Sequence, residues 1–120
     1  MHELSIAQNI LDIVRENVPQ GDEVLVRAVR VKIGAMAGVV PDSLAFCFSA
    51  ITHGTPLERA ALEIINVSLT VRCRTCGAES AIEQTLFFCP SCGGYELDVL
   101  AGRDMHVSEI ELDDEKENRP

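Results

Sequence analysis

The sequence has no tryptophan, and aromatic residues make up only 4% of its 120 residues. The core is therefore expected to consist of Val, Ile and Leu. No apolar run approaches the roughly 18 residues that a membrane-spanning helix needs. The first residues, Met1-His2-Glu3, lack the basic and then apolar pattern of a signal peptide. We expect a soluble, cytoplasmic chain with one domain and no room for a second full core.

Positive charge is also scarce. Ten Lys and Arg residues face nineteen Asp and Glu residues, which gives a formal net charge of −9. Nucleic acids and anionic membranes are bound by clustered cations that displace counterions. Neither is therefore an expected partner. Residues 113–120 contain no apolar side chain and are expected to form an acidic, flexible tail.

Apolar periodicity predicts a small set of helices and strands. Spacings of three and four predict a helix over 4–18, with a broad apolar stripe, and a second helix that begins near Pro41 and ends before Gly54. Alternation predicts strands over 24–33, 96–100 and 105–112, and one long strand over 62–71 whose phase slips near Ile65. The order indicates an α+β fold: a small mixed sheet with two helices, plus an inserted four-cysteine, zinc-ribbon-like module.

Four of the five cysteines form two Cys-x-x-Cys-Gly turns, at Cys73, Cys76, Cys89 and Cys92. Two intervening residues allow both thiolates of a turn to point at one centre, and four thiolates suit tetrahedral Zn²⁺. Such a saturated ion supplies folding energy rather than catalysis. A rubredoxin-like iron centre has the same spacing and remains an alternative. Disulfides need an oxidising compartment, which nothing in the sequence indicates. A redox Cys-x-x-Cys pair would occur once, before a helix, whereas this motif occurs twice with no helix predicted after either copy.

A histidine directly after the first residue has its own metal chemistry. The α-amine, the amide nitrogen of His2 and its imidazole can all reach one ion in a plane, and Glu3 can complete a fourth position or orient the imidazole. Planar, nitrogen-rich sites suit Ni²⁺ or Cu²⁺. The alternative is that His2 and Glu3 merely precede a helix, with Glu3 near its positive end.

Together these motifs resemble the HypA/HybF family of hydrogenase-maturation nickel metallochaperones. The resemblance lies in the opening run from Met1 to Ala7, the segment from Phe46 to Thr55, both cysteine turns, and the stretch from Gly102 to Glu111. It covers about residues 1–112. One departure is the apolar loop from Gly34 to Gly38, where the family often carries an acidic residue.

The resemblance implies a nickel-binding α+β domain, residues 1–69 with 97–112, and a zinc-binding module, residues 70–96. It implies that His2 and Glu3 carry transported Ni²⁺ and that the four paired cysteines carry structural Zn²⁺. Members of the family deliver nickel to the large subunit of [NiFe]-hydrogenase with the GTPase HypB, and some also serve urease. A homodimer and a further nickel donor such as His106 remain open. No catalytic set of residues is visible, so no enzyme activity is expected.

Overall fold

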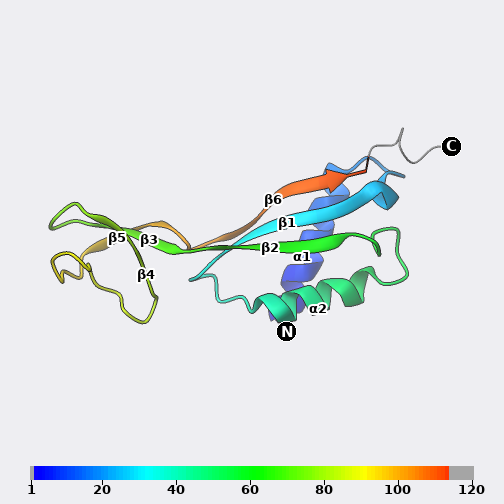
Figure 1. Cartoon of the computed structure of the whole chain (residues 1–120). Helices are drawn as coiled ribbons and strands as arrows, with labels where there is room; N and C mark the ends of the chain where they lie inside the picture. The colour runs from blue at the N-terminus through cyan, green and yellow to red at the C-terminus, as the bar shows by residue number, and fades with distance from the viewer. Residues whose placement is uncertain (1, 114–120) are drawn as a thin grey trace. The chain divides into compact units, whose positions relative to one another are not determined.

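The computed structural model describes residues 2–113. The predicted acidic tail therefore lies, apart from Asp113, outside the described residues. Within them, no helix combines the length and the hydropathy that a bilayer crossing requires. The elements in chain order are α1 (His2–Asn17), the 3₁₀ helix η1 (Glu23–Leu25), β1 (Val26–Gly34), α2 (Pro41–Thr52), β2 (Ala61–Val67), β3 (Leu69–Cys73), β4 (Glu79–Ile82), β5 (Leu97–Ala101) and β6 (Met105–Leu112) (Figure 1).

The strands form two three-stranded sheets, with the orders β2-β1-β6 and β4-β3-β5. In the first sheet β1 and β2 run in the same direction, and β6 runs opposite to them (Figure 1). In the second sheet β3 is antiparallel to both of its neighbours. The predicted α+β class, with a mixed sheet and two helices, is confirmed.

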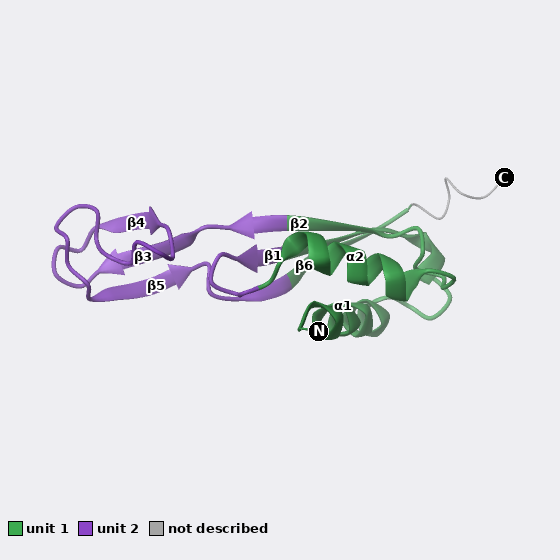
Figure 2. Cartoon of the chain, turned by 90° about the horizontal axis from the view of Figure 1, so that it is seen from below, with its two compact units in different colours: residues 1–31, 39–64, 107–120 green, residues 32–38, 65–106 purple. Residues whose placement is uncertain are grey.

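The chain divides into two compact units (Figure 2). Of the described residues, unit 1 comprises 2–31, 39–64 and 107–113, and unit 2 comprises 32–38 and 65–106. Unit 1 contains both helices, and unit 2 contains all four paired cysteines.

The core of unit 1 forms where α1 packs against α2. The buried stripe of α1 is narrower than the sequence predicts, since Leu4 and Ile13 are 43% and 38% exposed. A helix with only one covered side buries about a third of its circumference. The stripe that is buried consists of Ala7, Ile10, Leu11 and Val14.

The predicted long strand over 62–71 is wrong. Residues on the two sides of Ser68 belong to β2 and β3, which lie in different sheets. The strands are separate because β2 pairs with β1, whereas β3 pairs with β4 and β5. The backbone of Gly102 crosses the chain at this break, where an added Cβ would lie 2.6 Å from the Cα of Leu69 and from the carbonyl oxygen of Ser68. This crossing occurs between residues far apart in sequence. Apolar alternation does not reveal it.

Two short elements were not predicted from the sequence, β4 and η1. The strand β4 has no apolar alternation strong enough to mark it. It forms because β3 provides an antiparallel partner, with Leu69 opposite Ile82 and Arg72 opposite Glu79.

Arg30 of β1 joins all three strands of the first sheet. Its guanidinium pairs with Glu63 of β2 at 2.9 Å and with Glu109 and Glu111 of β6 at 3.1 and 2.8 Å. The Glu111 hydrogen bond is the main cause of a raised pKa of Arg30. A planar guanidinium can bind several carboxylates at once, so one cation neutralises part of this acidic chain while it links β1 to its neighbours.

We expect Gly102→Ala to destabilise the protein far more than Gly21→Ala. Both glycines have a left-handed backbone, with φ of +97° and +94°, but only Gly102 has backbone atoms where the methyl group would go. The left-handed conformation alone costs about 1–2 kcal/mol for alanine. The collision should at least double that loss at Gly102. Urea unfolding of both variants measures the difference, and equal losses would contradict the crossing.

Candidate metal centre

The structure brings Cys73, Cys76, Cys89 and Cys92 together in unit 2. Their four Sγ atoms all lie within 4.8 Å of one another. The Sγ atoms of Cys73 and Cys92 are 3.6 Å apart, as are those of Cys76 and Cys89. Four sulfurs about 2.3 Å from a shared tetrahedral ion lie about 3.8 Å from each other. The cluster therefore has the size of a four-thiolate metal site.

The two Cys-x-x-Cys-Gly turns are closed by the same pair of backbone hydrogen bonds. In the first turn the N–H of Gly77 donates to the carbonyl of Cys73 at 2.8 Å, and the N–H of Cys73 donates to Ala78 at 2.9 Å. Both turns need the glycine, which has a φ of +78° in each. The second turn repeats the two bonds with Cys89, Gly93 and Gly94.

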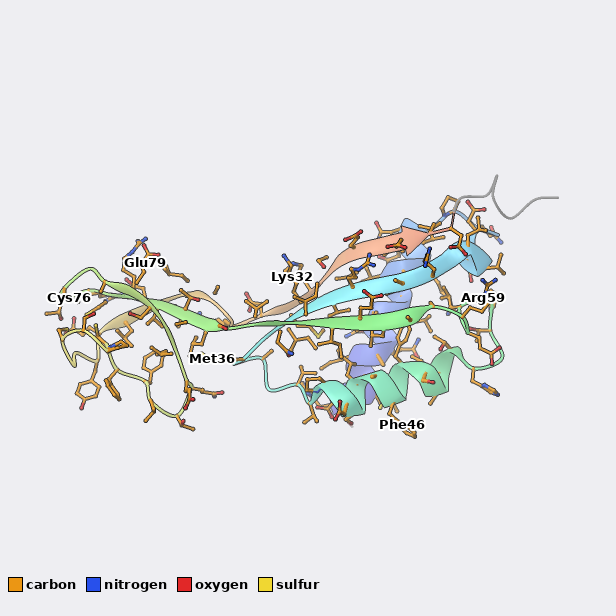
Figure 3. All side chains as sticks on the ribbon, viewed as in Figure 1. Lys32, Met36, Phe46, Arg59, Cys76 and Glu79 are labelled. Carbon is orange, nitrogen blue, oxygen red and sulfur yellow. The ribbon has the colours of Figure 1, made fainter. Side chains whose placement is uncertain are left out.

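Each turn comes from a different part of the second sheet. Cys73 is the last residue of β3, and Cys76 lies in the loop that leads to β4 (Figure 3). Cys89 and Cys92 lie between β4 and β5. The first cysteine of each turn is buried and the second is exposed, so the cluster has a protected half and a solvent-facing half.

The turns also stabilise negative charge on the first cysteine. Backbone N–H groups of Cys76 and Thr75 lower the pKa of Cys73 to about 6 against the effect of burial. The N–H of Cys92 lowers the pKa of Cys89 in the same way. At Cys92 the N–H of Gly94 favours the thiolate, but the neighbouring sulfurs and burial outweigh it and raise the pKa to about 12. Four close thiols thus lose their protons unequally, which is expected of groups whose thiolates repel each other.

The positive charges beside the cluster are already paired. Arg72 contacts Glu79 at 2.8 Å, and Arg74 contacts Asp98 at 2.7 Å. These two arginines therefore link β3 and the residue after it to β4 and β5. They do not form the basic surface that a nucleic-acid-binding ribbon requires.

The second predicted site lies at the start of α1 in unit 1. His2 is 63% exposed, and its Nδ1 is 3.9 Å from the Oε2 atom of Glu3. The Glu3 carboxylate also accepts a hydrogen bond of 3.3 Å from the N–H of Val40, the residue before α2. This bond is the main reason why the pKa of Glu3 is lowered, followed by the N–H of Glu3 itself. Sequence reasoning missed Val40, because the two residues are 37 positions apart.

The remaining candidate donors are placed elsewhere. His53 is paired with Glu58, with its Nδ1 2.9 Å from the carboxylate oxygen. Cys47 is half-buried on α2 and is not part of the thiol cluster. His106 belongs to unit 2 and lines an open cavity there.

Comparison with known proteins decides the family. Residues 1–112 match the family described as "Hydrogenase/urease nickel incorporation, metallochaperone, hypA". The chain belongs to the HypA family. HypA proteins are metallochaperones that act in hydrogenase maturation and are not enzymes, so the predicted family and the predicted lack of enzyme activity are both confirmed.

Relatives and solved structures agree with this assignment. The chain is 42% identical to hydrogenase maturation factor HypA of Geotalea uraniireducens (strain Rf4), over 94% of this chain and 100% of that one. It is 39% identical to the HypA of Trichodesmium erythraeum (strain IMS101), over 95% and 97% of the two chains. The solution structure of the Ni metallochaperone HypA from Helicobacter pylori has the same fold, with a TM-score of 0.63 and 16% identity, over 94% of this chain and 98% of that one.

In the metal-free protein we expect a thiolate to form near pH 6, well below the ordinary pKa of 9.0. Below that pH Cys73 is protonated, and above it the two N–H donors stabilise its negative charge. Thiolate absorbance in the ultraviolet, followed against pH, measures the step. Cys73→Ser should reduce the absorbance gained near pH 6, because Cys89 remains as the other thiol whose pKa is lowered, whereas Cys47→Ser should leave the titration unchanged. A titration without thiolate below pH 8 would contradict this assignment.

Proposed function

We propose that the chain binds Ni(II) at its N-terminus, through His2 with Glu3 beside it, and delivers the ion during maturation of [NiFe]-hydrogenase. Membership of the HypA family supports the role, and the observation that carries the site is the exposed His2 imidazole next to an anchored carboxylate. A shallow site at a chain end has few rigid walls. It therefore suits a protein that must release its metal as well as bind it.

Glu3 has a positioning role in this proposal. Its carboxylate accepts the N–H of Val40, and its side chain is only 16% exposed, whereas the side chain of His2 is 63% exposed. A fixed carboxylate beside an imidazole can select the tautomer that leaves the other ring nitrogen for the metal. Glu3 would thus link the metal-binding residue to the start of α2.

We further propose that Cys73, Cys76, Cys89 and Cys92 hold a structural Zn²⁺, which supplies folding energy to a zinc module of residues 70–96. Residues 1–69 with 97–112 would then form the nickel-binding domain. The sulfur separations of 3.6 Å support a four-thiolate ion. Iron is the competing ion, because a rubredoxin-like centre has the same ligands.

The partners follow from the role in hydrogenase maturation. We propose the GTPase HypB and the hydrogenase large subunit as partners, with urease maturation factors as further candidates. A homodimer is compatible with the proposal. The place of action would be the cytoplasm, where thiols stay reduced and remain available to metal.

We expect His2→Ala to weaken Ni²⁺ binding by about tenfold or more, because loss of even an outer-shell partner of a metal ligand costs about 10–100-fold in affinity. Stability should hardly change, because the side chain is 63% exposed. Calorimetric titration of the untagged protein measures binding. His53→Ala is the matched control, since His53 is also exposed and lies in unit 1. Unchanged nickel affinity in His2→Ala would refute the N-terminal site.

We expect the purified protein to contain one zinc ion per chain and Cys89→Ser to lose it. Three remaining thiolates leave an open position and a weaker site. Elemental analysis after dialysis gives the metal content, and Cys47→Ser should retain the ion because Cys47 lies outside the cluster. Iron in place of zinc, with the red colour of ferric thiolate, would identify the competing centre.

A further inference from the structure

An open cavity of about 660 Å³ lies within unit 2, and none of the four clustered cysteines lines it. Its lining combines residues from the ends of β1 and β2, from β5 and from the turn before β6. The polar residues around it are Lys32, Asn66, Ser68, Arg103, Asp104 and His106.

Two cations at this cavity are unusual because neither forms an ion pair with any carboxylate of residues 2–113. Five arginines of residues 2–113 are ion-paired with carboxylates: Arg27, Arg30, Arg59, Arg72 and Arg74. Within the same residues Lys32, Arg103 and Arg15 form no ion pair, and two of these three line the cavity. In a protein with a net charge of −9, unpaired cations gathered at one cavity favour an anionic ligand.

The cavity is suited to an extended ligand with apolar side chains. It is open to solvent, whereas small-molecule sites usually enclose most of their ligand. Val67, Val99 and Leu100 give its lining apolar surface in addition to the cations. Three residues of β5 contribute to the lining, and β5 is an edge of its sheet. An edge strand has backbone N–H and C=O groups that an added extended segment can bind.

The single carboxylate of the lining, that of Asp104, offsets only one of the two positive charges of Lys32 and Arg103. Asp104 forms no ion pair with Lys32 or Arg103, and its backbone carbonyl accepts the N–H of Gly34 at 2.9 Å, which fixes the main chain at the cavity rim. With Lys32 and Arg103 both charged, the lining is net positive before any contribution from His106. Ser68 and Asn66 add neutral hydrogen-bond donors.

We propose that this cavity binds an extended acidic segment of a protein partner, whose carboxylates pair with Lys32 and Arg103 while its apolar side chains cover Val99 and Leu100. Its lining contains neither His2 nor Glu3, the proposed nickel ligands, and the proposal does not depend on them. It gives unit 2 a docking role in addition to its metal site.

The test uses a fluorescein-labelled synthetic peptide of alternating Glu and Val residues, with fluorescence anisotropy of the full-length, metal-loaded protein. The double variant Lys32→Glu/Arg103→Glu should bind it at least about tenfold more weakly, because rim charges become repulsive. Arg15→Glu is the matched control, since Arg15 is the third unpaired cation and lies in unit 1; it should change affinity less than about twofold. Nickel binding should be equal in all three proteins, which separates this site from the proposed nickel function.

Three results would overturn the proposal. One is equal binding of a peptide with Gln in place of Glu, which would show that carboxylates are not recognised. Another is an equal loss in Arg15→Glu, which would indicate a general charge effect. The third is complete displacement of the peptide by inorganic phosphate at matched ionic strength, which would indicate a small-anion site.

Discussion

The convergence of four thiols is the constraint on which unit 2 depends. Among the described residues, unit 2 buries only five apolar side chains: Ile33, Leu69, Val71, Cys73 and Cys89. Two of the five belong to the thiol cluster itself. Each buried aliphatic side chain stabilises a fold by about 1.5–3 kcal/mol, and ordering the backbone costs about 1–2 kcal/mol per residue. So small an apolar core does not offset that cost, and in the proposed metal site bonds to the ion would replace the missing packing.

Unit 1 is stabilised differently. It has a larger apolar core, and ion pairs balance the acidic residues on one face of its sheet. The helices cover a core of aliphatic residues with one aromatic, Phe48. On the solvent side Arg30 gathers carboxylates from β2 and β6. A surface ion pair alone contributes little, but a network on a half-buried guanidinium is held in place by its neighbours. Part of the negative charge of the chain is therefore neutralised within unit 1, because several carboxylates form ion pairs with arginines.

Sequence patterns predicted the features that local spacing controls. The two helices follow from apolar periodicity, and the convergence of Cys73 and Cys76 follows from a two-residue interval and the glycine after it. The adjacency of His2 and Glu3 is given by the chain itself. The opening motif and the cysteine turns together also predicted the family, because their combination is more specific than either motif alone.

Features that depend on distant partners were not predictable. The break at Ser68 lies where the backbone of Gly102 approaches the chain, and β4 forms because β3 is available beside it. The contact between Glu3 and Val40 joins the starts of two helices. The unpaired state of Lys32 and Arg103 can be recognised only after the other arginines are matched with their carboxylates. The glycine at position 102 was the only sequence signal of the close backbone approach. A glycine alone does not indicate which strand lies next to it.

The alternation of buried and exposed cysteines makes the two halves of the thiol cluster chemically unequal. Cys73 and Cys89 are buried, whereas Cys76 and Cys92 are exposed to solvent. Chelators and peroxides in solution would therefore meet Cys76 and Cys92 first. If the cluster holds an ion, the two buried thiolates would be the ligands best protected from exchange and oxidation.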